Sequence, residues 1–123
     1  TGEYTRAYLD KDKIAAALND LFDDPGFRVD VVKIDVEGSE GRALRGMHRL
    51  LARSPDVRIL MEFAPAMLAG SGVPAPEVVA MLEGLGLSPW TVGEGGALHP
   101  ARWSDLARMQ DGLQNILVAR EAP

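Results

Sequence analysis

Apolar residues follow two different periods along this chain, and the alternation of the two predicts a layered α/β domain. Apolar positions that recur every three or four residues indicate helices, and short β-branched runs between turn residues indicate strands. Helices are expected at residues 11–22, 39–52, 74–85 and 104–109, and strands at residues 30–36, 57–63, 87–92 and 114–119. Helices between strands imply parallel pairing, whereas the last two strands lack a long connecting helix and favour an antiparallel pair.

The strand Asp30–Val36 carries the most informative pattern. Its apolar residues are β-branched, as in a parallel strand that is covered on both faces. The acidic residues Asp35 and Glu37 stand at its carboxyl end, before a glycine that turns the chain into the next helix. In open α/β sheets the ligand crevice lies at the carboxyl ends of such strands. We therefore expect both carboxylates to line a ligand site.

Composition narrows the class of function. A length of 123 residues is typical of one domain, and a net charge of −5 argues against a broad nucleic-acid surface. The chain has no cysteine, so thiolate catalysis and cysteine-ligated zinc are excluded. No apolar run reaches the roughly 20 residues of a membrane helix, and the first residues lack the apolar core of a signal peptide. The expected location is cytoplasmic.

The block from Lys33 to Gly46 contains Lys-Ile-Asp-Val-Glu-Gly, then Ser-Glu, then Leu-Arg-Gly. This block resembles the FkbM family of S-adenosylmethionine-dependent methyltransferases, and the similarity extends over roughly residues 30–120. That family has a Rossmann-like, doubly wound class I methyltransferase sheet of seven strands. The resemblance implies that residues 1–123 form a single domain equivalent to the C-terminal half, with parallel strands, a final antiparallel strand and flanking helices.

The resemblance also implies an activity. In the intact enzyme a methyl group would pass from S-adenosylmethionine to a hydroxyl group of a small-molecule acceptor, such as a natural product. Asp35 and Glu37 would contact the cofactor or act as the catalytic base, and Glu62 and His99 would contact the acceptor. The family holds its cofactor mainly through the first half of the fold, including a glycine-rich turn. The late cluster Gly93–Gly96 does not follow a buried strand into a helix, so we expect this chain alone to bind the cofactor weakly and to be inactive.

Other interpretations of the same residues remain open. Asp35 can pair with Lys33 or cap the following helix, and Glu62 can pair with Arg58. Glu40 fits the first turn of a helix, where an acid is favoured by the helix dipole. Asp35, Glu37 and Glu62 also offer oxygen ligands for Mg²⁺, as in a carboxylate-dependent magnesium enzyme.

A non-catalytic role is the other alternative. In half of a sheet, the strand Asp30–Val36 would have a free apolar edge, which is a template for pairing with another chain. We expect a homodimer in which this strand pairs with its own copy, or a cover formed by residues 1–9. The chain would then be a dimerisation or docking module.

Overall fold

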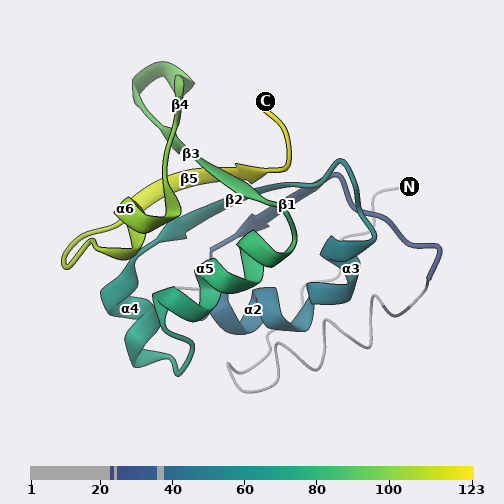
Figure 1. The fold of residues 1–123 in the computed structure, drawn as a ribbon, viewed down its shortest axis with the longest axis horizontal. Helices are drawn as coiled ribbons and strands as arrows, with labels where there is room; N and C mark the ends of the chain where they lie inside the picture. The colour runs from purple at the N-terminus through teal and green to yellow at the C-terminus, as the bar shows by residue number, and fades with distance from the viewer. Residues whose placement is uncertain (1–22, 24, 36–37) are drawn as a thin grey trace.

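The computed structural model describes residues 23, 25–35 and 38–123. These residues form one five-stranded sheet with short helices (Figure 1). The strands are β1 (Val31–Ile34), β2 (Arg58–Phe63), β3 (Ser88–Val92), β4 (Leu98–Pro100) and β5 (Gln114–Ala119). The helices are α2 (Glu40–Gly46), α3 (His48–Ala52), α4 (Pro65–Gly70), α5 (Ala75–Gly84), α6 (Trp103–Ala107) and the 3₁₀ turn η1 (Glu94–Gly96). The expected helix at residues 11–22 and the lead-in at residues 1–9 lie outside the described residues.

The strands lie in the order β1-β2-β5-β3-β4. β1 and β2 are parallel, whereas β5 is antiparallel to both of its neighbours, β2 and β3. It follows that β1, β2 and β3 run in one direction and that β5, the last strand of the chain, runs in the opposite direction. The mixed α/β class and the antiparallel pairing of the predicted last two strands are confirmed. The short strand β4, which forms an antiparallel hairpin with β3, was not predicted.

Pro89 in the strand expected at residues 87–92 favours an edge position, because proline cannot donate to a ladder. This prediction is wrong, because β3 lies between β5 and β4. Pairing with β4 begins only at Trp90, one residue after Pro89. The carbonyl oxygen of Pro89 accepts a hydrogen bond from the Ala101 N–H on that outer side. The proline nitrogen faces the same side, so no hydrogen bond to β5 is lost.

The helix expected at residues 39–52 is two helices, α2 and α3, separated at Met47. The backbone of Met47 has φ −102° and ψ 15°, which leaves the helical region. Ser39 makes no side-chain capping hydrogen bond. Its hydroxyl group is fully buried and has no hydrogen-bond partner in the described part of the chain.

The hydrophobic core lies on one face of the sheet, between the strands and helices α2, α3, α4 and α5. Ile34, Ile59 and Ile116 share this face and are at most 5% exposed. The opposite face of the sheet is more exposed to solvent: Val31 is 63% exposed and Leu60 is 40% exposed. The expectation of a first strand covered on both faces is therefore wrong: of the four residues of β1, only Ile34 is buried.

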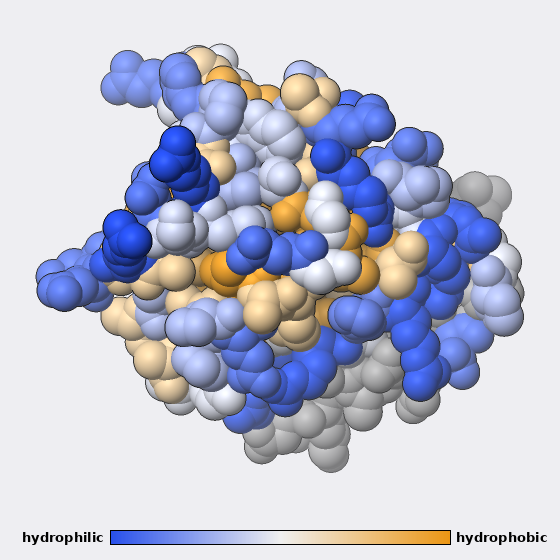
Figure 2. All heavy atoms as spheres, viewed as in Figure 1, coloured by the Kyte–Doolittle hydropathy of each residue, from blue (hydrophilic) through white to orange (hydrophobic). Residues whose placement is uncertain are grey.

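The viewed side of the molecule is mostly hydrophilic, with apolar residues gathered mainly near its middle and others at its upper edge (Figure 2). Within the described residues, no helix combines the length and the apolar character required to traverse a bilayer.

Candidate functional site

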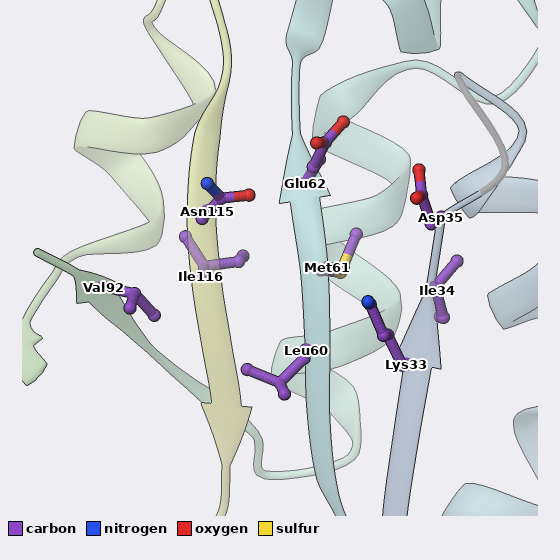
Figure 3. A pocket seen from close by; sticks show the side chains of 9 residues that line it. All are labelled: Lys33, Ile34, Asp35, Leu60, Met61, Glu62, Val92, Asn115 and Ile116. Atoms are coloured by element: carbon purple, nitrogen blue, oxygen red, sulfur yellow. The ribbon is translucent and has the colours of Figure 1, made fainter. Parts of the chain in front are cut away.

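A pocket of about 310 Å³ lies on the open face of the sheet (Figure 3). Asp35 follows the last residue of β1, and Glu62 is the last residue but one of β2. Asn115, near the start of the antiparallel strand β5, is the register partner of Glu62. The remaining lining residues are Lys33, Ile34, Leu60, Met61, Val92 and Ile116. Two carboxylates and a carboxamide thus meet at the carboxyl ends of the first two strands.

The alternation of the strands explains why polar groups reach this pocket. Lys33 of β1 is the register partner of Leu60 of β2. Asp35 comes two residues after Lys33 and lines the same pocket as Glu62, which comes two residues after Leu60. Met61, of the opposite parity, is 4% exposed and belongs to the core. The pocket therefore has an apolar floor at Leu60 and an acidic end at Asp35 and Glu62.

A third carboxyl group of the site, that of Glu40, is buried. Glu40 is the first residue of α2 and is only 3% exposed. Burial raises the pKa of this carboxyl group, because desolvation penalises the charged form. The backbone N–H groups of Glu40 and Gly38 donate to it and partly offset the rise, whereas the negative charges of Glu62 and Asp35 add to it.

Sequence reasoning assigned Glu40 to the helix dipole and missed its burial. The residue does lie in the first turn of α2. Its first-turn position on α2 does not reveal that the side chain is only 3% exposed. Glycine at position 38, in the same short block, is the one local sign of a tight approach.

The turn that joins β1 to α2 is closely packed. Gly38 has φ +92°, a conformation that favours glycine. A Cβ atom at this position would lie 3.1 Å from the carbonyl oxygen of Met67 in α4. Three residues later, in α2, a Cβ atom at Gly41 would lie 2.7 Å from the side chain of Val73. A side chain at either glycine would therefore meet atoms of α4 or of the segment before α5.

The structure brings together some of the residues that the sequence singled out. Asp35 and Glu62 line one pocket, as expected from the carboxyl ends of parallel strands. Glu37 lies outside the described residues. His99 is exposed on β4, the strand at the far end of the sheet from β1, and does not line this pocket.

The described part of the chain offers no set of side chains that could ligate a metal ion. Across residues 23, 25–35 and 38–123, no group of three or more histidine, cysteine or acidic side chains could hold a metal ion.

Comparison with known proteins identifies the family. Residues 6–86 match the family described as the methyltransferase FkbM domain. The match contains β1, the buried turn, α2 and β2, and so includes Asp35, Glu40 and Glu62. Neither the curated proteins nor the solved structures contain a significant match. Because the matched segment covers well over half of the 123 residues, the chain belongs to the FkbM methyltransferase family.

Proposed function

We propose that this domain is part of an S-adenosylmethionine-dependent methyltransferase that methylates a hydroxyl group of a small molecule. The observation that carries the proposal is the meeting of Asp35, Glu62 and Asn115 in one pocket at the carboxyl ends of β1 and β2. Family membership supports methyl transfer. A small-molecule acceptor fits a pocket of about 310 Å³, which is at the lower end of the usual range for ligand sites.

The strand order supports a finer statement about the fold. We infer that β1, β2, β3 and β5 are the fourth, fifth, sixth and seventh strands of a Rossmann-like class I methyltransferase sheet. β1, β2 and β3 run in the same direction, and β5 lies antiparallel between β2 and β3. This arrangement agrees with half of a doubly wound sheet that ends in one reversed strand.

The cofactor is suited to the acidic end of the pocket. When bound, S-adenosylmethionine supplies a methyl group on a positively charged sulfur and also carries an ammonium group. Asp35 and Glu62 offer carboxylate oxygens to such cationic groups, and Asn115 adds an amide donor and acceptor. We propose that the chain's own site engages only part of the cofactor, so that binding by residues 1–123 alone is weak and methyl transfer is absent.

The carboxylate of Asp35 is the proposed catalytic base, with Glu37 as the neighbouring carboxylate of the same segment. Asp35 is exposed and lines the pocket, so an acceptor hydroxyl can approach it. It would accept the hydroxyl proton as the acceptor oxygen bonds to the methyl carbon and the bond between that carbon and sulfur breaks, with S-adenosylhomocysteine as the leaving group. Glu62 and Asn115 would orient the acceptor, since proper placement of the two reacting atoms supplies much of the rate enhancement.

Calorimetry and a methyl-transfer assay test the proposal. S-adenosylhomocysteine and S-adenosylmethionine are titrated into this chain and into the chain extended by the sequence that precedes it in its gene. Binding by the extended form is expected, and failure of both forms to bind would refute the proposal. In the extended form, Asp35→Asn should lower kcat by roughly 10²-fold or more. Asp56→Asn, the same change at an exposed residue outside this pocket, is the control.

A second candidate role is a docking module that pairs through β1. β1 is the end strand of the described sheet, and Val31 is 63% exposed. Such an edge can pair antiparallel with the same strand of a second copy. Sedimentation equilibrium of the wild type and of Val31→Lys tests this role. A wild type that stays monomeric at high concentration would rule it out.

A further inference from the structure

One cation of the pocket has no place in the mechanism above. Lys33 lines the pocket together with Asp35 and Glu62, and its side chain is exposed. A pair between Lys33 and Asp35 was one of the interpretations that the sequence left open. Across residues 23, 25–35 and 38–123, neither an ion pair nor a hydrogen bond engages the Lys33 ammonium group. This group is therefore available to a ligand of the pocket.

The strands place Lys33 and the two acids at different levels of one face of the sheet. Lys33 is the register partner of Leu60, and Asp35 and Glu62 each come two residues later on their chains. Two residues of a strand rise about 6.6 Å. Figure 3 shows the ammonium group of Lys33 directed from β1 toward β2, with both carboxylates farther along the strands. The pocket thus holds a cation beside its apolar floor and an acidic end two residues beyond.

A second cation on the open face does not join this pocket. Arg58 lies two residues before Leu60 in β2, so its side chain is on the same face. It lines a separate pocket together with the acids Asp56 and Glu121. Among the described residues that line the pocket of Lys33, no other is cationic. One ammonium group therefore faces an anionic ligand there.

This arrangement of charges fits a ligand with a hydroxyl group at one end and an anionic group at the other. The hydroxyl group would reach the carboxylate of Asp35, and the anionic group would accept a hydrogen bond from the ammonium group of Lys33. A single negative charge fits better than two, because Asp35 and Glu62 repel further negative charge in the same pocket. A carboxylate meets this condition better than a phosphate monoester.

We propose that Lys33 is a specificity-determining residue, which selects acceptors that carry a carboxylate roughly 6–7 Å from the hydroxyl group to be methylated. The acceptor class is thus a hydroxy acid with an apolar spacer, which lies over Leu60. The inference rests on the proposed function, because it names the acceptor of the same pocket. One ammonium group at an exposed site gives a modest preference, about fivefold.

Two probes of nearly equal shape isolate the contribution of the carboxylate. 4-Hydroxybenzoate carries a hydroxyl group and a carboxylate at opposite ends of an apolar ring, and 4-hydroxybenzamide has a neutral amide in place of the carboxylate. Each is titrated into the chain, and the dissociation constant is measured from NMR chemical shifts of the pocket residues. The wild type should bind the carboxylate about fivefold more tightly than the amide. Equal affinities, or no binding of the carboxylate at millimolar concentrations, would overturn the inference.

Substitutions of Lys33 test whether its charge is the cause. Lys33→Gln should abolish the preference for 4-hydroxybenzoate and leave the affinity for 4-hydroxybenzamide unchanged, whereas Lys33→Arg should keep the preference. Arg49→Gln is the matched control for the loss of one positive charge, because Arg49 lies on α3, outside this pocket, with a side chain that is 76% exposed. A preference that persists in Lys33→Gln, or that Arg49→Gln abolishes equally, would overturn the inference.

The carboxylate of the cofactor is the competing anion for Lys33. In the extended chain, S-adenosylhomocysteine should bind Lys33→Gln and the wild type with dissociation constants within about twofold of each other. A loss as large as that for 4-hydroxybenzoate would assign Lys33 to the cofactor and overturn the inference. If the extended wild type binds no cofactor, the proposed function fails, while the titration with the two probes still decides whether Lys33 selects a carboxylate.

Discussion

Two glycines in helices provide a quantitative test of how tightly α2 is packed beside the site. A Cβ atom at Gly41 would lie 2.7 Å from Cβ and Cγ1 of Val73 and 3.0 Å from Cγ2 of Val78. Both valines are at most 1% exposed, so neither can move into solvent. At Gly84, in the last turn of α5, a Cβ atom would meet nothing within 4 Å. The same substitution by alanine therefore has opposite expected effects at the two positions.

The magnitudes follow from two opposing effects. Replacing a helical glycine with alanine stabilises a helix by about 1 kcal/mol. Forcing an extra methyl group into a packed core costs about 1–3 kcal/mol. Gly41→Ala should thus change the free energy of unfolding by between roughly 0 and −2 kcal/mol, and Gly84→Ala should raise it by about 0.5–1 kcal/mol.

Urea denaturation followed by circular dichroism measures both variants under identical conditions. Gly84→Ala should unfold at a higher urea concentration than the wild type, and Gly41→Ala at the same or a lower concentration, with equal m-values. A variant Gly41→Ala as stable as Gly84→Ala would refute the close approach of α2 to Val73.

Three further substitutions test individual interactions. The guanidinium group of Arg120 donates to four backbone carbonyl oxygens, at 2.6–3.3 Å, so Arg120→Lys should lower the free energy of unfolding by about 1–3 kcal/mol in a urea titration. Trp103→Phe removes the buried hydrogen bond from Nε1 to the Leu87 carbonyl oxygen, at 3.0 Å, and should cost about 1–2 kcal/mol by the same measurement. The pKa of Glu40 is raised by burial, so its ionisation destabilises the fold as the pH rises through that pKa. The wild type should therefore lose stability relative to Glu40→Gln as the pH rises above about 4.5.

The strands were predictable to the extent that their own residues determine them. The strand at residues 114–119 agrees fully with β5, and those at 57–63 and 87–92 agree with β2 and β3 within one residue. These segments are apolar runs between turn residues. β4 was not predicted because Leu98–Pro100 is exposed along its whole length and carries no apolar period. Its pairing with β3 gives it its structure.

The site was predictable only where it depends on the parallel strands β1 and β2. Asp35 and Glu62 were expected in one crevice because the carboxyl ends of parallel strands meet at one edge. Asn115 was not, because the position of β5 between β2 and β3 is not visible in the sequence of β5. Exposure of the Val31 face was also missed, since a β-branched run looks the same whether one or both faces are covered.

The reversed direction of β5 is what gives the pocket its chemistry. Had β5 been parallel to β2, its carboxyl end, with Ala119 and Arg120, would stand beside Glu62. Because β5 is antiparallel, its first residues stand there, and Asn115 is opposite Glu62. An amide donor beside two carboxylates can satisfy one of them and leave the other for a ligand. Arg120 is instead carried to the opposite end of the sheet, where it binds the carbonyl oxygens of Leu51 and Ser54. The topology thus separates an acidic pocket at one end from a structural arginine at the other.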